Sequence, residues 1–123
     1  MSSRYLWTPL QLGPVETRNR IVFSAHLTNY ARDGLPTAQH AAYYAARAAG
    51  GTGLIITEGT TINDPVASMG ESIPAFHGEQ ALAGWKHVVE QVHAAGGKIF
   101  PQLWHVGITR DPAKMNNPEL PNA

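Results

Sequence analysis

The sequence predicts an α/β fold built on a parallel sheet. Three short apolar runs, residues 20–24, 53–58 and 98–103, alternate along the chain with two segments of helical periodicity. None of these runs alternates cleanly between apolar and polar residues, which is typical of strands covered on both faces. The order strand, helix, strand, helix, strand therefore predicts two βα units followed by a third strand.

A hairpin is expected before the first of these strands, because residues 10–12 and 15–19 flank a turn-forming Gly-Pro pair. The first helix is predicted within residues 36–51, with Thr37 as its N-cap and a Gly-Gly pair as its stop. Its apolar face is expected to contain four residues at helical spacing: Ala41, Tyr44, Ala45 and Ala48.

The second helix is predicted within residues 78–97 and ends at another Gly-Gly pair. Gly84 inside it costs about 1 kcal/mol relative to Ala, which indicates a close approach to a neighbouring element. The apolar face of this second helix is expected to comprise Leu82, Trp85, Val89 and Val92.

After the third strand, residues 108–123 are rich in Pro and Asn and predict an irregular tail.

Composition excludes several classes of function. Lys plus Arg and Asp plus Glu both number 9, so no basic field would attract nucleic acid or an anionic membrane. The sequence contains no Cys, which excludes disulfides and thiolate metal sites within it and favours a reducing compartment. We see neither a leader peptide nor a run of about 18 apolar residues. A soluble, cytoplasmic domain is the expectation.

Polar side chains gather where the predicted strands end. The first strand leads into residues 24–29 (SAHLTN), the second into 57–61 (TEGTT) and the third into 102–105 (QLWH). Ligands bind at the carboxyl ends of the strands in parallel sheets and α/β barrels. The segments that follow strands are long and those that precede them are short, which favours a barrel with its functional face at the strand tops.

Three blocks of the sequence resemble the Old Yellow Enzyme family of flavin oxidoreductases, which includes 2,4-dienoyl-CoA reductase-like enzymes. The blocks are RNRIVFSAH, DGLPTAQHAAYYAARAAGGTGLIITEGT and GWKHVVEQVHAAGGKIFPQLWHVG, within residues 5–110. The resemblance implies a TIM barrel that holds FMN at its strand tops. Such a barrel needs about 250 residues. We therefore expect residues 1–123 to be an incomplete barrel of about three βα units, with 1–19 as an N-terminal cap and 108–123 as the tail.

The resemblance also implies roles for single residues. Gln102 matches the amide that hydrogen-bonds the flavin pyrimidine, whose mixed donors and acceptors suit an amide. Gly59 matches the small residue whose backbone meets the flavin carbonyl edge, because a glycine lets a flat ligand come close. Thr28 and Trp104 are expected in the substrate pocket. The stretch that runs along the flavin ring is matched by Ala25, His26 and Leu27.

Three positions depart from the family pattern. Leu27 stands where members often have Thr or Cys, Ala25 replaces the usual Pro, and Ile108 follows HVG in place of an Arg. The family's His/Asn pair, its proton-donating Tyr and its phosphate loops match nothing in these 123 residues. No catalytic residue is therefore assigned in this chain.

Other polar residues are given structural interpretations. His26 and His105 lack a cluster with metal-ligand spacing, so no metal site is assigned. Glu58, an acidic residue at a strand end, is expected to pair with a nearby Arg rather than to act as an acid or base.

In the intact enzyme the resemblance implies hydride transfer from NAD(P)H through FMN to an activated alkene, such as an enone or an enoyl thioester. This chain would contribute part of the flavin site, with a small molecule as substrate and the rest of the barrel, or a further copy, as partner. Whether an iron–sulfur cluster follows is left open. Two alternatives remain at this point: an inactive truncated fragment, and one half of a split barrel completed by a second chain.

Overall fold

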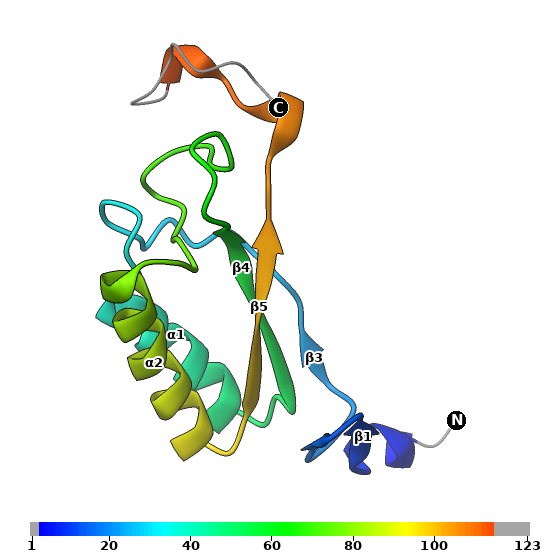
Figure 1. The fold of residues 1–123 in the computed structure, drawn as a ribbon. Coiled ribbons are helices and arrows are strands. Elements are labelled where there is room, and N and C mark those ends of the chain that lie inside the picture. Colours follow the sequence, from blue (N-terminus) through cyan, green and yellow to red (C-terminus); the bar gives the residue numbers. More distant parts are fainter. Residues whose placement is uncertain (1–2, 115–123) are drawn as a thin grey trace.

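A computed structural model describes residues 3–114 as a mixed α/β unit (Figure 1). Strands β3 (Val22–Phe23), β4 (Leu54–Thr61) and β5 (Lys98–Trp104) form a parallel sheet in the order β3-β4-β5. The helices α1 (Ala38–Ala49) and α2 (Glu79–Ala94) connect these strands. The predicted order of strands and helices is confirmed.

An antiparallel hairpin stands before this sheet, where the sequence predicts one. It comprises β1 (Leu10–Leu12) and β2 (Val15–Thr17). In the predicted tail, 3-10 turns occupy Gly107–Thr109 and Pro112–Lys114, and residues 115–123 lie outside the described part. Another 3-10 turn, Ser3–Trp7, precedes the hairpin.

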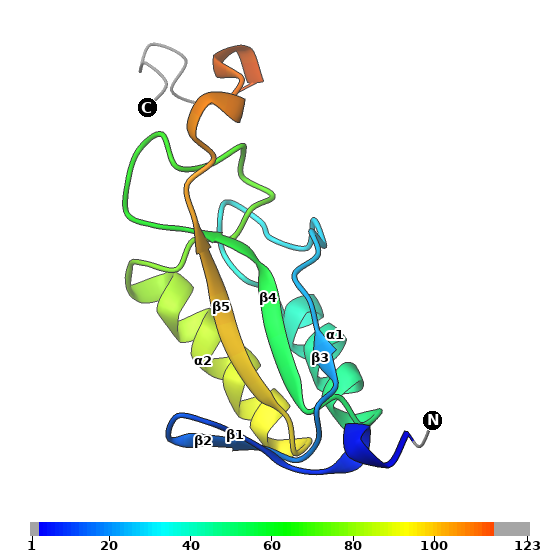
Figure 2. The same cartoon turned by 90° about the vertical axis from the view of Figure 1, so that its right-hand side faces the viewer.

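Both helices cover the same face of the sheet and leave the other face without a covering layer of described residues (Figures 1 and 2). The apolar core lies between that face and the helices. Neither of the two helices within residues 3–114 combines the length and apolarity needed to cross a membrane. The core cluster comprises Ala41, Tyr44, Ala48, Ile55, Trp85, Val88 and Val92.

Helix α1 begins as the sequence predicts. Thr37 is its N-cap, and the backbone N–H of Thr37 donates to Nδ1 of His40 at 3.0 Å. His40 is fully buried, whereas Ala45, which was expected on the buried face, is half-buried. The buried face therefore begins nearer the start of the helix than expected. It includes the imidazole of His40, which the apolar pattern did not include.

The expected apolar face of α2 is confirmed for Trp85 and Val92 and is wrong by one residue at Leu82 and Val89. The residues that this helix buries are Ala81, Trp85, Val88 and Val92, whereas Leu82 is 46% exposed. The Nε1–H of the buried Trp85 donates to the carbonyl of Ala75 at 2.8 Å. The close approach expected at Gly84 is confirmed, since a Cβ there would lie 2.7 Å from Cγ of Pro36.

The strands differ in length from the apolar runs. β3 has two paired residues instead of the five of run 20–24, while β4 continues three residues past its predicted end. Within β4, the backbone N–H of Glu58 donates to the hydroxyl of Tyr44 at 2.8 Å. The register between β4 and β5 also shifts here, because residues 57–58 stand opposite the single residue Pro101, which has no N–H to donate.

The hairpin is attached to the amino-terminal end of the sheet, opposite the strand tops (Figure 2). Arg18, directly after β2, donates from its guanidinium to the carbonyls of Ala48, Thr52 and Ala95. These carbonyls belong to the last turn of α1 and to residues just after α1 and α2, where backbone acceptors lack helical partners. Arg18 therefore ties both helix ends to the hairpin.

Candidate functional site

The carboxyl ends of β4 and β5 bring two of the expected cofactor residues together. Gly59 and Gln102 are direct Cα partners across the two strands. The side chain of Gln102 is exposed on the face of the sheet that carries no helix, as are those of Lys98 and Phe100. The amide of Gln102 has no hydrogen-bond partner within residues 3–114. It is an available donor and acceptor at the strand top.

Hydroxyl groups fix the backbone of Gln102 on both sides. Its N–H donates to Oγ1 of Thr57 at 3.1 Å, and its carbonyl accepts from Oγ1 of Thr60 at 2.9 Å. These bonds replace ladder bonds that the shift opposite Pro101 interrupts. The main chain of Gln102 is thus held firmly while its side chain is left available.

Trp104 packs directly on Gly59. A Cβ at Gly59 would lie 2.4 Å from Cδ2 of the Trp104 indole, so only a residue without a side chain fits there. The indole Nε1 is buried, and no acceptor for it is found in the described part of the chain. Gly59, Gln102 and Trp104 therefore form one group at the tops of β4 and β5.

The stretch expected along the flavin ring lies on the other side of β4. Ala25 is half-buried, His26 and Leu27 are exposed, and all three follow β3. Nδ1 of His26 lies 2.6 Å from the carbonyl of Ser24, and its ring lies 4.9 Å from that of Phe23. Strand β4 separates this stretch from Gln102, so the structure gives two groups of expected residues rather than one.

Sequence reasoning missed a buried hydrogen-bonded network between these two groups. Glu58 and His40 are both 0% exposed, and Nε2 of His40 lies 2.8 Å from Oε1 of Glu58. The hydroxyl of Thr28 donates to the same carboxylate oxygen, and the backbone N–H of Thr28 donates to Oε2 at 3.3 Å. The expected Arg partner of Glu58 is wrong, because a histidine occupies that place. One signal was available: His40 stands three residues after the N-cap Thr37, at the spacing of a capping box.

Tyr44, on helix α1, is hydrogen-bonded to the main chain of this network. Its side chain is 1% exposed, and its hydroxyl accepts the backbone N–H of Glu58. Burial raises the pKa of the Tyr44 hydroxyl well above its usual value, so it stays protonated at every ordinary pH. The strand is thereby anchored to α1 at the residue that precedes Gly59.

Two loops meet above the strand tops. Nε2 of His105 lies 3.5 Å from Oδ1 of Asp64, and the N–H of Val106 donates to the carbonyl of Ala67 at 3.2 Å. His105 thus links the long loop after β4 to the segment after β5. Within residues 3–114, no group of three or more His, Cys, Asp or Glu side chains is placed to hold a metal ion.

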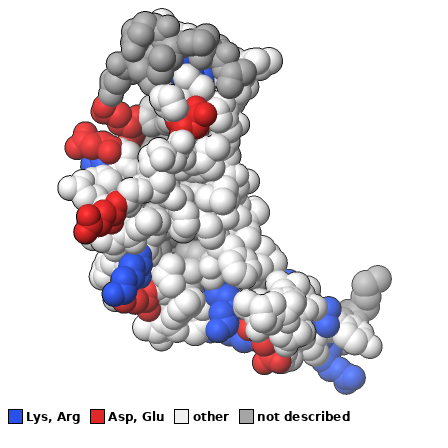
Figure 3. Space-filling view, viewed as in Figure 1, with Lys and Arg blue, Asp and Glu red and all other residues white. Residues whose placement is uncertain are grey.

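The helix-free face of the sheet is apolar. Charged side chains lie along the helical side and at the lower end, while the middle of the opposite side is uncharged (Figure 3). Exposed apolar side chains on this face include Val22 (51%) and Phe100 (41%). Such a face is expected where a barrel interior would be covered by further strands.

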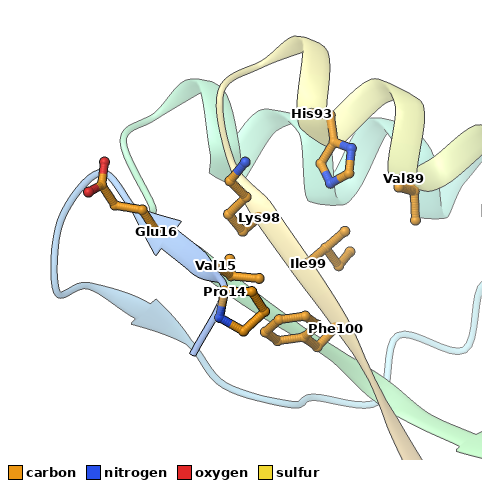
Figure 4. A pocket seen from close by; sticks show the side chains of 8 residues that line it. All are labelled: Pro14, Val15, Glu16, Val89, His93, Lys98, Ile99 and Phe100. Carbon is orange, nitrogen blue, oxygen red and sulfur yellow. The ribbon is translucent and has the colours of Figure 1, made fainter. Parts of the chain in front are cut away.

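A cavity of about 500 Å³ lies far from the strand tops, between the hairpin, α2 and the start of β5 (Figure 4). Its walls include Val15, Val89, Ile99 and Phe100, with His93 and Lys98 beside them. It opens at the amino-terminal end of β5, so it is separate from the group formed by Gly59, Gln102 and Trp104.

The chain matches a protein-family model over residues 5–121, that of the NADH:flavin oxidoreductase / NADH oxidase family. The chain belongs to this family. The resemblance drawn from the sequence is therefore confirmed.

Several named proteins are similar to this chain. A 12-oxophytodienoate reductase-like protein of Solanum lycopersicum is 37% identical over 102 residues, which are 83% of this chain and 28% of that protein. The structure of morphinone reductase in complex with tetrahydroNAD matches with a TM-score of 0.85 at 39% identity, over 94% of this chain and 31% of that one. An old yellow enzyme homologue from Zymomonas mobilis matches with a TM-score of 0.84 at 33% identity, covering 95% and 32%.

The chain spans less than a third of the length of these relatives. Its three-stranded sheet corresponds to part of their barrel, and the sheet of the described residues is not closed. The predicted fold, an incomplete barrel, is confirmed.

Proposed function

We propose that this chain forms one wall of an FMN site in an ene-reductase that uses NAD(P)H. The observation that supports this most directly is the pairing of Gly59 with Gln102 across β4 and β5. Gly59 leaves room for the Trp104 indole that packs on it, and Gln102 offers an available amide beside this pair. A flat heterocycle that carries N–H and C=O groups along one edge fits this combination.

The residues present fit FMN on physical grounds. An amide that carries two donors and an acceptor gains most from a ligand that presents both kinds of group. The stretch Ala25-His26-Leu27 would lie along the ring from the β3 side, while Thr28 and Trp104 would border the substrate. When bound, FMN would pass a hydride from NAD(P)H to the substrate. The chain's own part is to bind and orient.

The substrate class that we propose is an activated alkene, such as an enone or an enoyl thioester. Relatives are named as reductases of 12-oxophytodienoate and of morphinone, which are carbonyl compounds. No catalytic residue of the chain is part of this proposal. A cytoplasmic location belongs to it, because a sequence without Cys suits a reducing compartment.

A complete site requires further strands. The apolar face that carries Val22 and Phe100 would be covered by them, whether they come from a longer form of this chain or from a second chain. The second candidate function follows from the same face: an inactive fragment that folds no further and binds no flavin.

A fusion protein distinguishes an FMN-binding wall from an inactive fragment. In this fused barrel, the chain replaces the part of morphinone reductase that it matches. We expect the purified protein to be yellow and to hold FMN, and Gln102→Leu to raise the Kd for FMN by about 5- to 150-fold, equivalent to 1–3 kcal/mol. The matched control is Gln91→Leu, the same change at an exposed amide of α2. A folded fused barrel without FMN, or equal affinities for both variants, would contradict the proposal.

A further inference from the structure

We propose that the buried network of Thr28, His40 and Glu58 is a positioning device for the flavin site, one that sets the β3 side of the site against the β4 side. This inference rests on the proposed function. It assigns a role to three residues of which two, His40 and Glu58, contact no proposed ligand.

The place of the network in the chain supports this role. Thr28 directly follows Leu27, the last residue of the stretch proposed along the flavin ring, and Glu58 directly precedes Gly59. The two hydrogen bonds from Thr28 to Glu58 therefore join the two halves of the site through single peptide links. A change in these bonds moves Leu27 relative to Gly59.

The hydrogen bonds also define the protonation of the network. The N–H of Thr37 donates to Nδ1 of His40, so that nitrogen carries no proton. The proton of the neutral imidazole is then on Nε2, which donates to Glu58. Because the Thr28 hydroxyl and N–H donate to the same carboxylate, Glu58 accepts three hydrogen bonds within a site that excludes water. A buried carboxylate is stable only when it is satisfied in this way.

His40 extends the network into the core. Its ring centroid lies 5.7 Å from that of Trp85 and 5.8 Å from that of Tyr30. The hydroxyl of Thr37, the N-cap of α1, donates to the carbonyl of Tyr30 at 3.0 Å, so the loop after β3 is held at a second point besides Thr28. The network is thus tied to both helices and cannot shift alone.

Hydrogen exchange tests the holding role, both in the 123-residue chain and in the fused barrel. In the wild type we expect the backbone N–H groups of Thr28 and Tyr30 to be protected, because both donate hydrogen bonds within the network. Thr28→Val, which keeps the shape but removes the hydroxyl, should raise exchange at these two N–H groups by about tenfold and leave α2 unchanged. Thr28→Ser should restore the protection. Glu58→Gln should act as Thr28→Val does, whereas Glu90→Gln, the same change at an exposed carboxylate, should not.

The affinity for FMN in the fused barrel is the second measurement. Thr28→Val should raise the Kd for FMN by about tenfold, and Thr28→Ser should leave it near the wild-type value. The inference is overturned if the N–H groups of Thr28 and Tyr30 are unprotected in the wild type, or if Thr28→Val changes neither exchange nor affinity. It is also overturned if exchange rises while affinity for FMN is unchanged. If the wild-type fused barrel holds no FMN, the proposed function fails, and exchange alone then decides whether the network holds the loop.

Discussion

The indole of Trp104 lies so close to Gly59 that a single added carbon would overlap it, at 2.4 Å from Cδ2. The contact joins the last residue of β5 to a residue near the end of β4. It explains why the strand top has a glycine at this point before any ligand is considered.

Gly59→Ala should therefore displace the indole. We expect the free energy of unfolding of the fused barrel to fall by about 1–3 kcal/mol, the usual cost of overpacking, with a change in tryptophan fluorescence. Gly50→Ala is the control, because Gly50 is exposed and has an ordinary backbone conformation. A Gly59→Ala variant with unchanged stability and fluorescence would show that Trp104 does not occupy this position.

Trp104→Ala should alter which alkenes the fused barrel reduces and should leave the affinity for FMN nearly unchanged. The reason is that Gln102, rather than Trp104, presents an available amide toward the flavin edge. Steady-state kinetics with alkenes of different size, together with FMN titration, measure both effects. A loss of FMN with the same order of substrate preference would contradict the assignment.

The 123-residue chain alone should self-associate, because an apolar sheet face and two strand edges are uncovered in the described structure. Phe100→Lys should lower the associated fraction in sedimentation velocity. Ile108→Lys is the control, since Ile108 is 85% exposed but lies outside the sheet. A monodisperse wild-type monomer with a sharp cooperative melt would refute this prediction.

Tyr44→Phe should destabilise the fold, because the buried N–H of Glu58 loses its acceptor. We expect a loss of about 1–3 kcal/mol in urea unfolding of the fused barrel at neutral pH. Tyr43→Phe is the matched control, since the Tyr43 hydroxyl makes no hydrogen bond in the described part of the chain.

The same pair of variants tests the raised pKa of Tyr44. Above about pH 10, the unfolded chain releases a tyrosine proton that the folded chain keeps, so the free energy of unfolding falls as the pH rises. This fall should be shallower in Tyr44→Phe than in Tyr43→Phe. Equal slopes in the two variants would show that Tyr44 ionises as freely in the folded state as in the unfolded one.

Local patterns account for what the sequence determined by itself. Periodicity, the N-cap Thr37 and the Gly-Gly stops act within a few residues, so the order of the elements and the start of α1 were predictable. The polar strand ends could also be recognised, and with them Gly59, Gln102 and Trp104. Their proximity follows from one rule, that parallel strands end at the same edge of a sheet.

Contacts between distant residues decided the rest. The indole of Trp85 donates to the carbonyl of Ala75, and the backbone N–H of Glu58 donates to the hydroxyl of Tyr44. His40 and Glu58 are 18 residues apart and on different elements. The local sequence around either residue therefore does not predict that the other is its hydrogen-bond partner. Burial makes such partners obligatory, because a polar group without water must find a hydrogen bond, but only the packing of helix on sheet determines which group supplies it.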